Sequence, residues 1–398
     1  GRRSHHGKRS RCSCRSVGSG DGDCAPCAGG WLILIGLGVK AAWPLAHTWL
    51  TDGYPEATPT GSVWLSSFTT KCAVYAIARM FPGTEELIYI GALMAAFPIF
   101  YAVIENDLRR VLGYSMINQI GFMVTGIGIG THLAINGAVA HAFNDVLFKG
   151  LLFMSMGAVM YVTGRTKASD LGGLYKTMPI TATLCIIGAL SISGFPLTSG
   201  FTTKTLISQA ALDESLAVVY FLLAAASAGV FLHAGIKFPW FVFFQKDSGL
   251  RPPDPPSSMR YAMWLFSFLC IAIGLYPGPL YEILPYPVDY QPYTVDHLVT
   301  QFQLLLFAGF AFFVMLKQMR RTLTISLDFD WFYRKFFKEI TNEFTGFAKT
   351  TRSRAGRLTA GGSLTVQGTY VDGTGQTRVS GNVAVGRTRI ARDVTAPA

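Results

Sequence analysis

Nine long apolar runs constrain the fold of this chain more than any other feature. They lie at about 31–46, 61–81, 86–104, 111–130, 133–162, 178–210, 216–244, 259–280 and 298–317. A transmembrane helix needs about 20 predominantly apolar residues. Only 14% of the 398 residues are charged, whereas an ordinary soluble domain has about 25%. The sequence therefore predicts an all-α, polytopic membrane helical bundle of about nine transmembrane helices.

The basic residues are divided unequally between the two sides of this predicted bundle. Connections on one side contain Arg109, Arg110, Arg165, Lys167, Lys176, Lys246, Arg251, Arg260, Lys317, Arg320 and Arg321, whereas connections on the other contain no Lys or Arg. Cytoplasmic loops of membrane proteins carry an excess of Lys and Arg. We therefore expect a multi-pass protein of a prokaryotic plasma membrane with a cytoplasmic C-terminus. The net charge of +11 follows this topology and does not indicate nucleic acid.

Three further segments flank the transmembrane domain predicted at 31–317. Residues 1–30 have no apolar period and are predicted to be disordered or non-native; they contain Cys12, Cys14, Cys24 and Cys27, too weak a pattern to predict a metal site. Residues 318–348 mix aromatic and basic side chains, which is typical of a cytoplasmic interfacial amphipathic helix. Residues 349–398 are again predicted to be disordered or non-native.

Two lysines of the first half of the chain lie in apolar surroundings, where a charge is costly and by default marks a functional site. Lys40 is followed four residues later by Pro44, which removes the helix partner of the Lys40 carbonyl and predicts a broken helix. Lys71 lies near the middle of the run 61–81. For both residues the alternative is a lysine that snorkels to the membrane interface.

His141, Asp145 and Lys149 are spaced four residues apart in the run 133–162. On a helix this spacing places them on one face, over about 12 Å at 1.5 Å per residue. Because histidine titrates near neutral pH, the three residues could form a proton ladder. The alternative is a structural Asp145–Lys149 ion pair that neutralises both charges.

Lys204 follows a second interruption of an apolar run, formed by Gly194, Pro196 and Gly200. Interrupted segments in corresponding halves of a membrane protein indicate a transporter site. The two interrupted spans are expected to run in opposite directions, with lysine before proline in the first and after it in the second.

Other polar residues allow two interpretations. Lys237, four residues after His233, fits an ion pathway or an interfacial anchor equally well, and Glu105 and Asp107 beside Arg109 and Arg110 indicate a solvated ion-pair cluster. No P-loop, dinucleotide fingerprint, HExxH motif or nucleophile elbow is present in the sequence. We therefore predict no cofactor, no metal ion and no catalytic centre in the chain itself.

Four ordered motifs resemble the proton-translocating antiporter-like subunits of complex I, membrane-bound hydrogenases and multisubunit Mrp antiporters. They are KAAWPLAHTWLTDGYPEATPTGSVWLSSFTTKCAVYAIAR, ENDLRRVLGYSMINQIGFM, HAFNDVLFKGLLFMSMGAVMY and SGFPLTSGFTTK, and the resemblance extends over roughly residues 31–317. The tail motif DFDWFYRK makes the chain most similar to the D branch of the Mrp antiporter subunits. The resemblance implies two inverted five-helix repeats with broken helices at two half-channels. It assigns Lys40 and Lys204 to the two breaks and Lys71 to the link between the halves.

The same resemblance matches Lys149 and His141 to a central lysine and its histidine, while Asp145 stands where some members have a second histidine. The family's first six helices are absent before residue 31, which predicts that the chain is truncated at its N-terminus.

Three functions follow from these observations as hypotheses. The first is a proton-translocating subunit of a multisubunit Na⁺/proton antiporter, in contact with other membrane subunits, lipid, protons and Na⁺. The second is a proton-pumping subunit of an NADH-quinone oxidoreductase or membrane-bound hydrogenase. The third is a structural subunit whose charged residues only hold helices together. Substitutions that impair assembly but not transport would favour the third.

Overall fold

The structure of the chain is a computed structural model that describes residues 28–317, Asp328, Trp331, residues 335–343 and four short strands between 376 and 397. It divides into two compact units, residues 1–328 and 329–398. The predictions for residues 1–27, for most of the amphipathic segment and for most of the tail lie outside the described residues.

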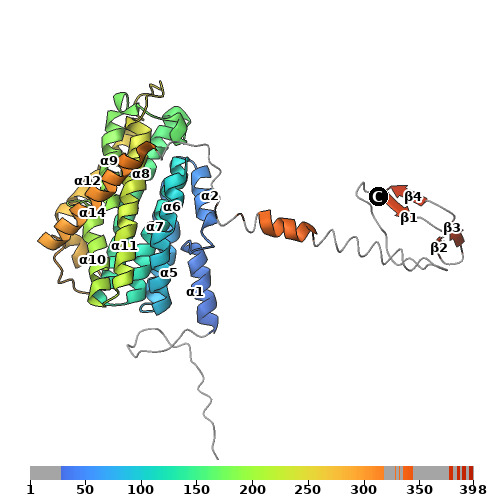
Figure 1. Cartoon of the computed structure of the whole chain (residues 1–398), viewed down its shortest axis with the longest axis horizontal. Coiled ribbons are helices and arrows are strands. Elements are labelled where there is room, and N and C mark those ends of the chain that lie inside the picture. The colour runs from blue at the N-terminus through green and yellow to red at the C-terminus, as the bar shows by residue number, and fades with distance from the viewer. Residues whose placement is uncertain are drawn as a thin grey trace, which may run out of the picture. The chain divides into compact units, whose positions relative to one another are not determined.

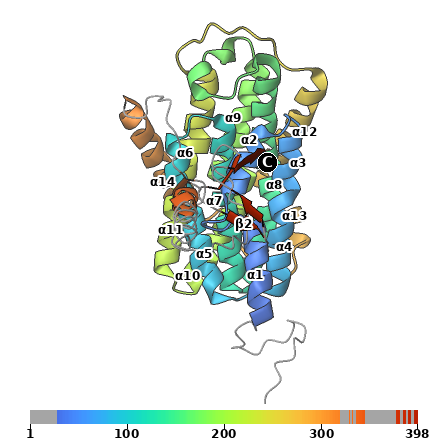
Figure 2. The same ribbon diagram turned by 90° about the vertical axis from the view of Figure 1, so that its right-hand side faces the viewer.

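The first unit is a bundle of helices that cover all nine predicted runs (Figures 1 and 2). In chain order they are α1 (Ala28–Lys40) and α2 (Thr48–Glu56); α3 (Gly61–Trp64), the π-helix η1 (Leu65–Thr69) and α4 (Thr70–Met80); α5 (Glu85–Ala96) and α6 (Pro98–Ile104); α7 (Leu108–Ile129); α8 (His132–Thr163); the 3₁₀ turns η2 (Ala168–Asp170) and η3 (Leu174–Lys176); α9 (Pro179–Ser193) and α10 (Ser199–Asp213); α11 (Ala217–Val230) with the π-helices η4 (Phe231–Lys237) and η5 (Trp240–Phe244); α12 (Ser257–Leu275); α13 (Gly278–Glu282); and α14 (Val295–Val314) with the 3₁₀ turn η6 (Met315–Lys317).

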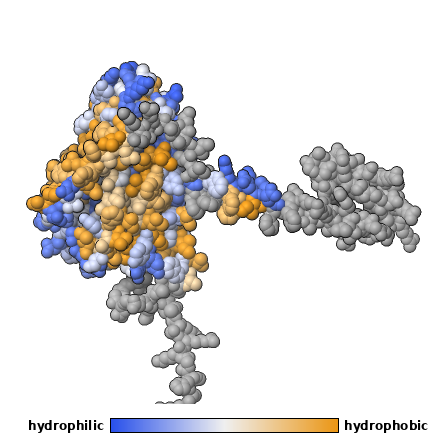
Figure 3. All heavy atoms as spheres, in the orientation of Figure 1, coloured by the Kyte–Doolittle hydropathy of each residue, from blue (hydrophilic) through white to orange (hydrophobic). Residues whose placement is uncertain are grey.

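Five helical spans among the described residues are long and apolar enough to cross a membrane by themselves. They are Glu85–Ile104, His132–Thr163, Ala217–Phe244, Ser257–Leu275 and Val295–Val314. The other predicted runs are interrupted, shorter or richer in polar residues. Figure 3 shows hydrophobic side chains over the middle of the bundle and hydrophilic ones gathered at its upper end. This distribution confirms a polytopic helical membrane protein.

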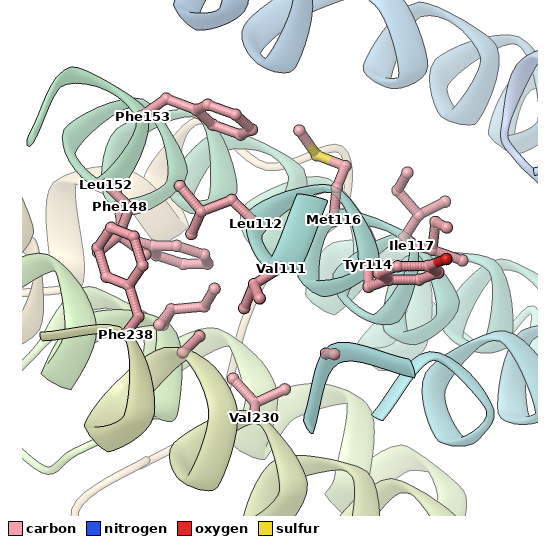
Figure 4. Close-up of a cluster of buried hydrophobic side chains, with 14 of the residues drawn as sticks. Val111, Leu112, Tyr114, Met116, Ile117, Phe148, Leu152, Phe153, Val230 and Phe238 are labelled. Atoms are coloured by element: carbon pink, nitrogen blue, oxygen red, sulfur yellow. The ribbon is translucent and has the colours of Figure 1, made fainter. Parts of the chain in front are cut away.

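Helix α7 forms the centre of the bundle, because 20 of its 22 residues are buried. Helix α5 packs so closely against it that a Cβ on Gly91 would overlap the backbone of Thr125, and a Cβ on Gly121 would overlap Ala95. Small residues at helix interfaces allow such close approach in membranes. Figure 4 shows the apolar side chains between α7, α8 and η4, with Phe148 and Phe238 side by side. The side chains between these helices are therefore largely apolar.

The two predicted helix breaks are present and have the same backbone geometry. Helix α1 ends at Lys40, after which Ala42 and Leu45 have positive φ values of 62° and 73°. Helix α9 ends at Ser193, after which Gly194 and Leu197 have φ values of 71° and 70°.

In each break the first left-handed residue closes the preceding helix with a Schellman motif. The N–H groups of Ala42 and Trp43 bond to the carbonyls of Val39 and Gly38, at 3.1 and 2.9 Å. In the second break the N–H groups of residues 194 and 195 bond to the carbonyls of residues 191 and 190, both at 3.0 Å. The sequences Ala-Trp-Pro-Leu and Gly-Phe-Pro-Leu therefore occupy equivalent positions. Figures 1 and 2 place α1 below α2 and α9 above α10, so the two spans run in opposite directions, as predicted.

The predicted solvated cluster around Arg109 is wrong. Arg109 is fully buried and its guanidinium donates to the carbonyls of Pro55 and Ala57 at 2.5 and 2.7 Å. Asp107 caps α7 by accepting the N–H of Arg109, and Glu105 is also buried. The carbonyls left free where α2 ends attract the guanidinium inward.

The second unit is described only in part. Residues 335–343 are helical, with Phe336, Phe337 and Ile340 exposed. Strand β1 (Gln376–Val379) pairs antiparallel with β4 (Val394–Pro397), and β2 (Val383–Val385) pairs antiparallel with β3 (Thr388–Ile390). The interfacial role of 318–348 and the disorder of 349–398 stay predictions.

Candidate functional site: buried charges at the centre of the bundle

Helix α8 positions three of the predicted site residues. His141, Asp145 and Lys149 are all fully buried on this helix, at successive steps of four residues. At 1.5 Å per residue they extend over about 12 Å of the helix. The structure thus places them together on one buried helix, as the spacing predicts.

Asp145 pairs with Lys71 and not with Lys149, so the alternative of an Asp145–Lys149 pair is wrong. The Lys71 amine lies 2.5 Å from a carboxylate oxygen of Asp145. It also donates to the Ser66 carbonyl at 2.8 Å and contacts the Met116 sulfur at 3.0 Å. Ser66 belongs to η1, where the widened helical turn changes the local backbone hydrogen bonding. The π-helix was not predicted, because it has no simple sequence signature.

Lys149 has a hydroxyl as its partner. Its amine donates to the Ser115 hydroxyl of α7 at 2.7 Å. Within the described part of the chain it forms no ion pair, although it is fully buried. A buried ammonium without a carboxylate partner is costly. Lys149 therefore lies where loss of its proton would remove an unpaired charge.

His141 connects three helices through its two ring nitrogens. Nδ1 lies 2.9 Å from the Thr203 hydroxyl of α10, and Nε2 lies 3.2 Å from the amide oxygen of Gln119 on α7. Gln119 in turn donates to Asn118 at 2.6 Å, and Asn118 donates to the Ala95 carbonyl. Polar groups therefore continue from α10 through α8 to α7 without an apolar gap.

Lys204 lies on α10, directly after Thr203, whose hydroxyl contacts His141. Its amine donates to the Ile192 carbonyl near the end of α9 at 2.6 Å and lies 5.2 Å from the centre of the Phe122 ring. Cations are favoured at helix C-termini and over aromatic faces. The predicted break creates this position, and Gly200 is required there because a Cβ would overlap the Ser191 carbonyl.

Lys40 and Lys237 do not join these residues. Lys40 is exposed at the end of α1. Lys237 is buried, but its amine donates to the carbonyls of Ala102, Val103 and Glu105 at 2.9, 2.7 and 2.7 Å. A lysine that binds the last carbonyls of a helix stabilises the helix end. The expectation of an interfacial anchor is therefore wrong for Lys237, and a place in the ion path stays a prediction.

Sequence reasoning missed the hydroxyl and amide partners of the site. Ser115, Asn118 and Gln119 lie within the apolar helix α7 at steps of three and four, so they share one face. This spacing of polar residues in an apolar run could have identified them. Among the described residues, no group of three or more His, Cys, Asp or Glu side chains could hold a metal ion.

These features define a class, that of polytopic membrane proteins with broken helices and a row of buried cationic side chains. Residues 19–231 match the family model described as NADH:quinone oxidoreductase/Mrp antiporter, TM, and the chain belongs to this family. The resemblance inferred from the motifs is thereby confirmed, whereas its refinement to the D branch stays a prediction.

Two relatives and one solved structure illustrate the range of this family. The chain is 30% identical over 289 residues to the Na(+)/H(+) antiporter subunit A1 of Staphylococcus haemolyticus (strain JCSC1435), which covers 64% of this chain and 36% of that protein. It is 30% identical over 262 residues to the NADH-quinone oxidoreductase subunit N of Desulforudis audaxviator (strain MP104C), covering 61% and 52%.

The fold is similar to a chain of the membrane-bound sulfane sulfur reductase, an archaeal respiratory membrane complex. The TM-score is 0.65 at 26% identity, over 80% of this chain and 64% of that one. The chain thus spans between about a third and two thirds of the length of these three proteins.

Proposed function

We propose that the chain is a proton-translocating membrane subunit of a multisubunit cation/proton antiporter. Its partners are other membrane subunits of that assembly, and the ions moved are protons in exchange for Na⁺. The relatives named as an Na(+)/H(+) antiporter subunit and as an oxidoreductase subunit support a subunit role. The charge asymmetry of the loops supports a prokaryotic plasma membrane and a cytoplasmic C-terminus.

The observation that carries this proposal is the presence of two buried lysines without carboxylate partners. Lys149 and Lys204 bond only to a hydroxyl and a carbonyl among the described residues. A structural role would be met more cheaply by apolar side chains of similar volume. Amines in this setting are suited to accept and release protons.

The hydrogen bonds indicate the order of transfer. A proton on Lys204 lies close to the Thr203–His141 pair, and His141 shares α8 with Lys149. Between His141 and Lys149 on α8, the Lys71–Asp145 pair fixes a positive charge against a negative one. When Lys149 is protonated, repulsion weakens the hold of neighbouring cations on their protons. Each transfer then favours the next one along the row.

The test replaces Lys149 and Lys204 singly by Ala in the native membrane complex that contains the full chain. Proton transport is measured in sealed vesicles with a pH-sensitive dye, and the amount of assembled complex is measured in parallel. Lys246→Met, an exposed lysine between η5 and α12, is the matched control. We expect transport to fall by at least about tenfold per assembled complex in both variants and not in the control.

Wild-type transport in both variants would contradict the proposal. If transport falls only in proportion to the amount of assembled complex, the structural alternative is favoured. The Lys71–Asp145 ion pair, which joins α4 to α8, also fits that alternative. A redox-driven pump is the second candidate, because one relative is named as an NADH-quinone oxidoreductase subunit. Vesicle transport distinguishes the two candidates. Proton transport by an antiporter should follow an imposed sodium gradient, whereas proton transport by a redox-driven pump should follow the supply of an electron donor.

A further inference from the structure

A cavity between α10, α11 and α14 extends from Lys204 towards one end of the bundle. Its volume is about 80 Å³, and its lining includes Lys204, Ser208, Ser227, Asp296 and His297. One water needs about 10–15 Å³ of such volume, so the cavity has room for several. It ends where the connecting loops contain no Lys or Arg, which we call the outer end.

The wall of this cavity contains a hydroxyl that has no other partner. The Ser227 oxygen is buried and forms no hydrogen bond within the described part of the chain. Buried hydroxyls are costly without a partner. Together with Thr205 and Ser208, which also line the cavity, Ser227 is suited to hold water beside the Lys204 amine.

The mouth of the cavity is crossed by a hydrogen bond between α14 and α10. Nε2 of His297 lies 3.2 Å from the amide oxygen of Gln209, whose own amide nitrogen donates to Asp213 at 2.7 Å. On its other side, Nδ1 of His297 lies 3.2 Å from the Pro292 carbonyl and 3.4 Å from the Tyr290 hydroxyl.

The partners of His297 depend on its protonation. The Gln209 oxygen and the Pro292 carbonyl are both acceptors, and only a doubly protonated imidazole can donate to both at once. A neutral imidazole donates to only one of them, and when that proton is on Nε2 the Nδ1 lone pair faces the Pro292 carbonyl and can accept from the Tyr290 hydroxyl. Loss of a proton therefore weakens one of the contacts that hold His297 across the mouth.

The charges near the mouth favour cations. Asp296 lines the cavity beside His297, and Asp213 lies behind Gln209. Since the outer-end connections carry acidic but no basic residues, the local potential raises the concentration of protons and other cations there. Lys204 is the one cationic side chain among the residues that line the cavity, apart from His297 when protonated.

We propose that His297 is a proton relay and gate at the mouth of this cavity, which connects Lys204 with the solution at the outer end. This inference rests on the proposed proton translocation and adds an access route to it. A proton taken up by His297 passes through water held by Ser227 and Ser208 to the Lys204 amine. The bond to Gln209 closes the mouth, and it is lost when the neutral imidazole donates from Nδ1 to the Pro292 carbonyl instead.

The first experiment compares His297→Gln with His132→Gln in the native membrane complex. His132 is also a histidine at the outer end, where it stacks on Tyr286 at 4.0 Å and does not line the cavity. We expect His297→Gln to lower proton transport about tenfold. His132→Gln should transport as the wild type does. Identical transport by the two variants would overturn the relay.

The second experiment tests the access route and does not depend on the His297 variant. Ser208→Cys is placed in a chain whose seven native cysteines are replaced by Ser. A membrane-impermeant maleimide added to the outer side should label it, and labelling from the inner side alone, or none, would overturn the cavity as an outer access route. Transport that survives Lys204→Ala would instead contradict the proposed function. If proton transport is lost in Lys204→Ala but not in His297→Gln, only the relay is contradicted.

Discussion

The ion pair between Lys71 and Asp145 gives the sharpest prediction about stability. Lys71→Met removes the cation and leaves the Asp145 carboxylate fully buried. Neither oxygen of this carboxylate accepts another hydrogen bond within the described residues. Removing one partner of a buried pair costs about 3–5 kcal/mol. We expect the upper part of this range, because no donor remains to compensate the charge.

The reverse substitution should cost less. Asp145→Asn leaves the Lys71 amine with the Ser66 carbonyl and the Met116 sulfur as acceptors, at 2.8 and 3.0 Å. We expect a loss of about 1–3 kcal/mol, the penalty for an imperfectly satisfied buried polar group. The double variant removes both charges and retains only a buried amide, so its cost is also about 1–3 kcal/mol. The two substitutions should therefore be non-additive by at least about 2 kcal/mol.

The assay is unfolding of the purified chain in mixed micelles as the fraction of denaturing detergent is raised. The free energy of unfolding is measured for the wild type, both single variants and the double variant. The reasoning requires that adding Asp145→Asn to Lys71→Met restores stability. If the double variant is as unstable as the sum of the single variants, or less stable than Lys71→Met, the pair does not determine the energetics of this position.

Two further predictions concern the second helix break and a surface loop. Gly200→Ala should destabilise the chain by about 1–3 kcal/mol, because its Cβ would overlap the Ser191 carbonyl. The control is Gly36→Ala in α1, which should not destabilise the chain because a Cβ there meets no atom within 4 Å. Equal unfolding midpoints for the two variants would contradict this prediction. In the loop before α12, the guanidinium of Arg251 lies 2.6 Å from Asp247 and lowers the pKa of that exposed carboxyl. Because the folded pKa is lowered, the contribution to stability is complete above the unfolded value of about 3.9 and is lost as the pH falls below it. Asp247→Asn should therefore lose less stability than the wild type between about pH 5 and pH 2, and parallel pH profiles of the two proteins would show the pairing to be without effect.

The helices and their interruptions could be predicted because both depend on local sequence. Apolar runs of about 20 residues fix the spans, and Pro44 and Pro196 fix the breaks because proline lacks an N–H. The partners of the buried charges could not be predicted in the same way. Whether Asp145 meets Lys71 or Lys149 depends on how α4 approaches α8, and no spacing within one helix contains that information.

Arg109 and Lys237 show a second limit of the sequence. Both side chains bond to backbone carbonyls at helix ends. The Arg109 guanidinium lies 2.5 Å from the Pro55 carbonyl, and the Lys237 amine lies 2.7 Å from the Val103 carbonyl. A carbonyl acceptor is present at every residue, so it leaves no mark in the sequence. The sequence indicates a solvated cluster for Arg109 and leaves an ion pathway and an interfacial anchor open for Lys237, whereas the structure buries both side chains.

The matching breaks at Ala42–Leu45 and Gly194–Leu197 have a consequence for how charge can be moved during evolution. Superposing the two motifs residue by residue puts Lys40 opposite Ile192, whose carbonyl binds the Lys204 amine. It puts Lys204 opposite Asp52, which instead pairs with Arg110 at 2.8 Å. The two breaks therefore share one backbone geometry but carry their lysines at different positions, before the turn in the first and after it in the second. A helix break of this kind can change its charge by substitution of side chains alone, with no change in how the backbone turns.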